Sequence, residues 1–107
     1  MKGNVEAATQ AFRRAIELRP DHSRAHNSLG ALLNEQGKEQ EAITEYRLAI
    51  QHDPNFASPR FALATLLKNR GDEDSAIEQY RKISQSGDDD YLQRISSKML
   101  RAMGEIP

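Results

Sequence analysis

The sequence predicts an all-α fold in which antiparallel helix pairs stack as a solenoid. Two observations predict it: a repeat of 34 residues, and apolar side chains that recur at helical spacing inside each repeat. When the sequence is shifted against itself by that length, small, aromatic, proline and leucine positions coincide. The coinciding sets are Gly3, Gly37 and Gly71; Ala8, Ala42 and Ala76; Phe12, Tyr46 and Tyr80; Pro20 and Pro54; Leu29 and Leu63; and Leu33 and Leu67.

The first complete repeat contains two expected helices. The first helix covers about residues 23–36, and Gly37 supplies the left-handed residue that ends it. The second helix covers about residues 39–52, and Pro54 follows because proline cannot continue a helix. Helices joined by so short a turn lie antiparallel. The apolar stripes are Ala25, Leu29, Leu32 and Leu33 on the first helix, and Ala42, Ile43, Tyr46, Ala49 and Ile50 on the second.

The second complete repeat follows the same pattern. We expect Ser58 to be the N-cap and Pro59 the first helical residue of a helix that ends near Arg70. A partner helix then runs from after Gly71 to about Ser86.

The two ends depart from the pattern. A helix over about residues 5–18 corresponds to the second helix of a repeat whose first helix is absent. At the other end, Asp90 and Gln93 predict the start of a final helix through a capping box. That helix has an apolar side (Leu92, Ile95, Met99 and Met103) and a basic side (Arg94, Lys98 and Arg101), as expected of a cap on an open core. The predicted organisation is therefore a half repeat at 1–22, repeats at 23–56 and 57–90, and a capping helix and tail at 91–107.

Composition argues against several classes of function. The 15 basic and 16 acidic residues are intermixed and give a net charge of −1, so no electrostatic case exists for nucleic acid or an anionic membrane as partner. The absence of cysteine removes disulfides and thiol catalysis and fits a reducing compartment. No stretch approaches the ~20 apolar residues of a membrane span, and no signal peptide is evident. We expect a cytoplasmic protein.

Chemical sites are weakly indicated. His22 and His26 have a spacing that suits a metal, but no third ligand is evident nearby. The run Asp88 to Asp90 is typical of a turn and an N-cap more than of a cation site. No nucleophile and base arrangement, paired carboxylates or phosphate loop can be recovered from the spacing. We therefore expect no enzyme activity, no metal and no cofactor.

The residues that carry the repeat resemble the tetratricopeptide repeat over residues 3–87. They follow the family's order: Leu29, Gly30, Leu33, Gly37, Ala42, Tyr46, Ala49 and Pro54. His26 departs from it by replacing a large residue, usually tryptophan, and Ala64 replaces the glycine of the next repeat. The resemblance implies a right-handed superhelix. It also implies that Gly30 and Ala42 are small because two helices approach closely there, beside Tyr46.

The resemblance further implies that the first helices line a concave face that binds an extended peptide or a partner helix. Helical spacing independently places each set of candidate residues along one side of its helix. The sets are Arg24, Asn27, Ser28, Ala31, Asn34 and Glu35 on one helix, and Ser58, Phe61, Ala62, Thr65, Lys68 and Asn69 on the next. Amides such as Asn27 and Asn34 suit a peptide backbone, and cations suit carboxylates. Phe61 offers an apolar anchor.

We therefore expect a protein-interaction module or scaffold. Two alternatives stay open. Because the expected helix at residues 5–18 lacks its family partner, Ala8, Phe12 and Ala15 leave apolar surface open. Either further repeats precede this segment, or a second copy of the chain covers that face and the protein self-associates. The other alternative is that the chain is the regulatory repeat region of a larger enzyme.

Overall fold

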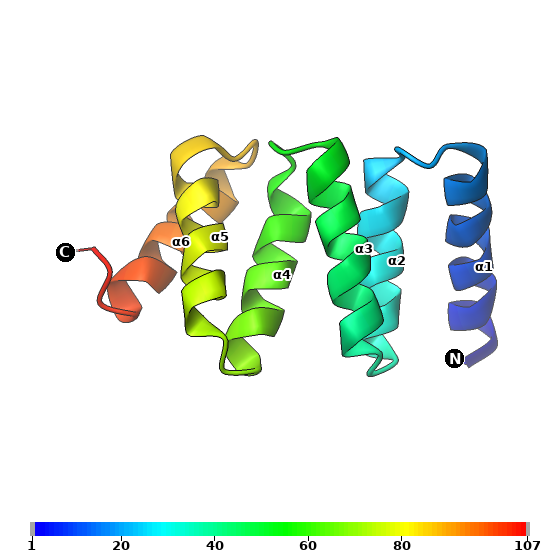
Figure 1. Cartoon of the computed structure of the whole chain (residues 1–107), viewed down its shortest axis with the longest axis horizontal. Helices are drawn as coiled ribbons and strands as arrows, with labels where there is room; N and C mark the ends of the chain where they lie inside the picture. The colour runs from blue at the N-terminus through cyan, green and yellow to red at the C-terminus, as the bar shows by residue number, and fades with distance from the viewer. Residues whose placement is uncertain (1, 107) are drawn as a thin grey trace. The chain divides into compact units, whose positions relative to one another are not determined.

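The computed structural model describes residues 2–106, and these form six α-helices with no strand among them. The helices divide into two compact units between Asp53 and Pro54. The first unit contains α1 (Lys2–Leu18), α2 (Ser23–Glu35) and α3 (Glu39–His52), and the second contains α4 (Ala57–Asn69), α5 (Glu73–Ser86) and α6 (Asp90–Ala102) (Figure 1). The all-α prediction is confirmed. The predicted repeat boundaries stay a prediction, and residues 1 and 107 lie outside the described residues.

The core of the first unit lies where α2 and α3 pack together. Six apolar side chains there are at most 3% exposed: Ala25, Leu29 and Leu33 from α2, and Ala42, Tyr46 and Ala49 from α3. The turn between the helices is the predicted one, because Gly37 has φ +78° and the Lys38 N–H donates to the Leu33 carbonyl at 2.9 Å. Helix α1 packs on α2, and none of its described side chains is fully buried.

The second unit repeats the helix pair and adds α6, which packs on α5 and α4. Leu63 of α4, Tyr80 and Ile83 of α5, and Leu100 of α6 are at most 1% exposed and form its core. Gly71, with φ +88°, ends α4 in the way that Gly37 ends α2.

Three predicted helix starts are wrong. Helix α1 begins at Lys2 and not near residue 5, so Gly3 lies inside the helix and does not repeat the turns at Gly37 and Gly71. Helix α4 begins at Ala57, with Phe56 at the N-cap position, so Ser58 does not cap it. The Ala57 N–H instead donates to the Asp88 carboxylate at 2.9 Å, so the turn between α5 and α6 satisfies the start of α4. Helix α6 is capped by Asp89, whose carboxylate accepts from the Leu92 N–H at 3.0 Å, one residue before the predicted Asp90.

The ring of Tyr46 on α3 packs directly against Gly30 of α2. A Cβ atom at this position would lie 2.8 Å from Cε1 of the Tyr46 ring, and Tyr46 is only 3% exposed. Real Cβ contacts are longer than this, so the ring occupies the space that a side chain would need. The predicted packing of Tyr46 beside Gly30 is confirmed, and the helix propensity lost at Gly30 is the cost of that packing.

We expect Gly30→Leu to lower the free energy of unfolding by about 1–3 kcal/mol, because the larger side chain overpacks the crossing. Chemical denaturation followed by circular dichroism measures the change. Gly3→Leu is the matched control, since a Cβ at Gly3 of α1 meets no atom within 4 Å. Equal stability of the two variants would contradict the packing role of Gly30.

Candidate functional site

The α2 residues of the expected concave face lie on the accessible side of their helix. Arg24, Ala31, Asn34 and Glu35 are exposed, while Asn27 and Ser28 are half-buried. The opposite side of α2 carries the buried residues of the core. One side of the helix is therefore packed inside the unit, and the other side is accessible and mostly polar. We call the polar side the α2 stripe.

The equivalent residues of α4, the α4 stripe, are accessible in the second unit. Ser58, Thr65 and Asn69 are exposed, and Phe61, Ala62 and Lys68 are half-buried. The Phe61 ring packs edge-on against Tyr80 at 5.8 Å between centroids, and the Thr65 hydroxyl lies 3.4 Å from the Tyr80 hydroxyl. Since Tyr80 is fully buried, it fixes the positions of Phe61 and Thr65.

Tyr46 links the α2 stripe to the core of the first unit. Burial raises the pKa of Tyr46, and the carboxylate of Glu35 on the stripe raises it further. The phenol therefore stays a neutral hydroxyl at physiological pH, because ionisation would place a negative charge in the core beside another one.

His26 occupies a core position of α2 and holds two contacts. Its side chain is almost fully buried, with Nδ1 2.7 Å from a Glu45 carboxylate oxygen on α3 and Nε2 2.8 Å from the Pro20 carbonyl. Each ring nitrogen of His26 therefore lies within hydrogen-bonding distance of one oxygen atom. The His52 ring stacks on it at 5.8 Å. His26 thus ties α2 to α3 and to the loop before α2.

Arg60 makes the same contacts in the second unit. Its Nε donates to the Pro54 carbonyl at 3.1 Å, and its Nη1 donates to the Gln79 side-chain oxygen at 2.8 Å. Burial lowers the pKa of Arg60, and the nearby Glu78 carboxylate partly offsets this. At the repeat offset Arg60 matches His26, Gln79 matches Glu45, and Pro54 matches Pro20.

Sequence reasoning missed this repeated polar pair, although it noted that His26 stands at a core position. The sequence did carry a signal, because Arg60 is a second polar residue at the position of His26. Glu45 and Gln79 are hydrogen-bonding residues at matching positions on the next helix. We call the two sets the buried polar pairs.

The side chains considered as metal ligands have structural contacts. The Ala25 N–H donates to His22 Nδ1 at 3.2 Å, so His22 caps α2, and the Asp88 and Asp89 carboxylates accept from backbone N–H groups. Within residues 2–106 no group of three His, Asp or Glu side chains is placed to hold a metal ion. No described helix is both long and apolar enough to cross a bilayer.

Comparison with known proteins identifies the repeat. Two family models described as tetratricopeptide repeat match residues 2–58 and 33–99. No curated protein sequence matches the chain. Among solved structures, the fold resembles MamA, with 23% identity, a TM-score of 0.74 and coverage of 89% of this chain and 52% of MamA. It also resembles the type III secretion translocator chaperone SycD of Yersinia enterocolitica, with 24% identity, a TM-score of 0.79 and coverage of 96% of this chain and 74% of SycD. The chain therefore spans about half the length of MamA.

The correspondence between the two buried polar pairs predicts the outcome of substitutions. We expect Glu45→Ala to destabilise the protein by about 1–3 kcal/mol, because a buried ring nitrogen of His26 loses its partner. His26→Arg combined with Glu45→Gln transplants the Arg60 arrangement, so this double variant should stay close to the wild-type stability.

Thermal and chemical unfolding measure these differences, and Glu41→Ala, an exposed change on the same helix, is the control. If the double variant is destabilised as much as Glu45→Ala, the two pairs are not equivalent.

Proposed function

Since the chain belongs to the tetratricopeptide repeat family, we propose that it is a non-catalytic protein-interaction module. Its ligand is an extended peptide or a partner helix, and each unit contributes its own binding surface, the α2 stripe in the first unit and the α4 stripe in the second. The observation that carries this proposal is the division of α2 and α4 into a buried apolar side and an accessible polar side. A side chain on such a helix is held in place before a partner arrives, which lowers the entropy cost of binding.

The chemistry of the stripes suits a peptide. Asn34 carries an amide that donates to and accepts from a peptide backbone, and Arg24 and Lys68 suit carboxylates. Phe61 is half-buried and held edge-on by Tyr80, as expected of an apolar anchor near the centre of an interface.

We expect Arg24→Glu with Lys68→Glu to weaken binding of a partner by on the order of tenfold, because two attractive charges become repulsive. The partner is first identified by affinity capture with the wild-type chain, and its affinity is then measured by isothermal titration calorimetry. Arg47→Glu with Lys82→Glu makes the same change in net charge on α3 and α5, outside both stripes. Equal affinity of the two double variants would contradict binding at the stripes.

The open face of α1 favours a second candidate function, self-association. On α3 the residues Ala42, Tyr46 and Ala49 are at most 3% exposed beneath α2. At the repeat offset they match Ala8, Phe12 and Ala15 of α1, which are only half-buried within the described residues. A second copy of the chain that covers this apolar face would bury it as α2 buries the face of α3.

If the chain self-associates, its sedimentation coefficient should rise with concentration, and Phe12→Glu should abolish that rise because it places a charge in the interface. Tyr91→Glu is the control, since Tyr91 is an exposed aromatic residue of the other unit. A monomer at every concentration tested, or equal effects of both substitutions, excludes this face as an interface.

A further inference from the structure

A hollow of about 330 Å³ lies between α5 and α6 in the second unit. Three of its lining residues are cations on α6, and the other three are neutral hydrogen-bonding residues. They are Arg94, Lys98 and Arg101, and Ser84, Gln93 and Ser97. None of the carboxylates of residues 2–106 lines the hollow. We call it the basic hollow, and none of its residues belongs to the α2 stripe or the α4 stripe.

Helix α6 corresponds to α4 at an offset of 33 residues, because the positive-φ glycine that ends each helix is Gly71 in α4 and Gly104 in α6. The side of α6 that packs on α5 and α4 carries its two fully buried residues, Ser96 and Leu100. The three cations are exposed on the accessible side of the helix. The charge that lines the basic hollow therefore stays in contact with solvent and carries no burial cost.

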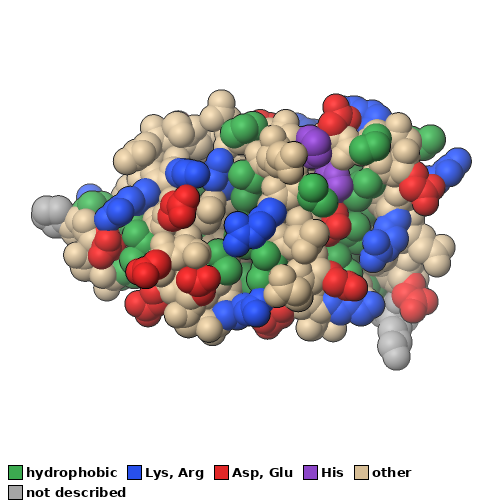
Figure 2. Space-filling view, in the orientation of Figure 1, with side chains coloured by type: hydrophobic (Ala, Val, Ile, Leu, Met, Phe, Trp, Pro, Cys, Tyr) green, Lys and Arg blue, Asp and Glu red, His purple; other side chains and the backbone are tan. Residues whose placement is uncertain are grey.

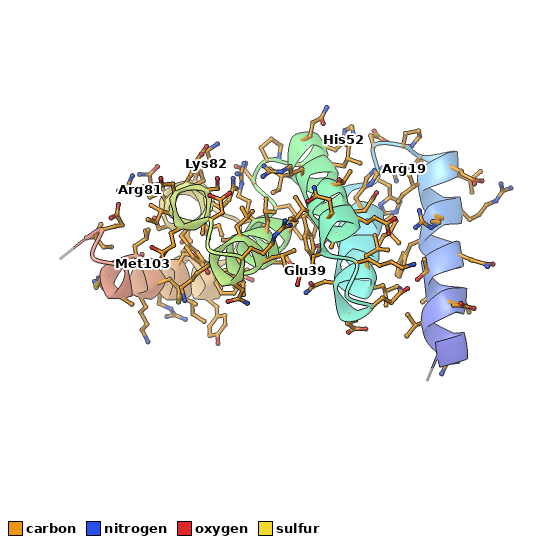
Figure 3. All side chains as sticks on the ribbon, turned by 60° about the horizontal axis from the view of Figure 1, so that its bottom comes forward. Arg19, Glu39, His52, Arg81, Lys82 and Met103 are labelled. Carbon is orange, nitrogen blue, oxygen red and sulfur yellow. The ribbon has the colours of Figure 1, made fainter. Side chains whose placement is uncertain are left out.

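The charge of this hollow differs from that of its surroundings. Acidic and basic side chains are mixed on the face shown in Figure 2. On the neighbouring side of α5, a hollow of about 420 Å³ holds charges of both signs, and Arg81 pairs with Glu105 at 2.6 Å while Lys82 pairs with Glu78 at 3.5 Å. Figure 3 labels Arg81 and Lys82 on α5, and shows nitrogen-tipped side chains projecting from the lower side of α6. A helix that only covers the core with polar residues does not need all the charges of one hollow to be positive.

The spacing of the cations selects the ligand. Arg94 and Arg101 are seven positions apart, so their Cα atoms are separated by about 10 Å along the helix axis. A single phosphate does not span that distance, whereas an extended peptide covers it in about three residues. Tyr91 is 62% exposed and precedes Arg94 by three positions on the same side of α6. Tyrosine and arginine together are typical of the centre of protein interfaces.

We propose that the basic hollow binds an acidic, extended segment of a partner protein, with carboxylates about three residues apart that meet the α6 cations. The neutral residues Ser84, Gln93 and Ser97 hydrogen-bond its backbone or carboxylate oxygens. A nucleic acid is the less favoured ligand. A nucleic acid carries a charge at every nucleotide, so a long phosphate backbone also meets Asp88 to Asp90 at the start of the same helix, whereas a short acidic segment needs to reach only from Arg94 to Arg101.

A fluorescein-labelled peptide with aspartate at every third position tests the proposal by fluorescence anisotropy at low salt. We expect it to bind, and binding should weaken as ionic strength rises. Arg94→Gln with Lys98→Gln should weaken it at least tenfold, because both charges are removed while helix propensity is kept. Circular dichroism checks that the variant is folded.

Three controls make the result decisive. The same peptide with asparagine in place of aspartate should not bind. Arg47→Gln with Lys82→Gln removes equal charge outside the basic hollow and should leave the affinity within twofold of wild type. A labelled single-stranded oligonucleotide of similar length tests the other ligand class. The proposal is overturned if the acidic peptide does not bind, or if both double variants lose affinity equally. It is also overturned if the oligonucleotide binds more tightly than the peptide and Arg94→Gln with Lys98→Gln abolishes that binding.

Discussion

The rest of the structure depends on the close approach of the two helices in each repeat. The chain has few aromatic residues and no tryptophan, so its core cannot be filled by large side chains alone. Burial comes instead from small residues that let helices approach, with one tyrosine ring filling the space beside them. At Gly30 the ring of Tyr46 takes the volume of the absent side chain. In the second unit Ala64 and Tyr80 are both fully buried at the matching positions, which shows that the arrangement also accepts a methyl group.

The buried polar pairs add specificity to this packing. Each pair joins the first helix to the second and to a proline carbonyl in the preceding loop. In the low-dielectric interior a hydrogen bond is strong, and a buried polar group without a partner costs free energy. Each pair is therefore satisfied only when the two helices and the preceding loop all take their native positions. His26 and Arg60 differ in structure, but each places one nitrogen beside a proline carbonyl and another beside a side-chain oxygen on the next helix. Tryptophan has a single ring nitrogen and cannot make both contacts.

The outer faces of α1 and α6 explain why the functional proposals arise outside the core of the repeat. Helix α1 keeps the apolar residues of a second helix without a first helix against them in the described chain, which suits association. Helix α6 carries Arg94, Lys98 and Arg101 on its accessible side, where they line a positively charged hollow. The two faces differ because burial rewards apolar residues, while a solvated face is free to carry charge.

The sequence by itself determined the helix pairs, the glycine turns and the core. Helices α3 and α5 and the end at Gly37 follow from local periodicity and from a backbone conformation that glycine readily adopts. Only the tertiary structure decided the start of α4, because its N–H is satisfied by Asp88, 31 residues away. The same holds for the partners of His26 and Arg60, each 19 residues distant. Local patterns reveal which residues are buried, but a hydrogen bond between distant residues exists only once packing has placed donor and acceptor together.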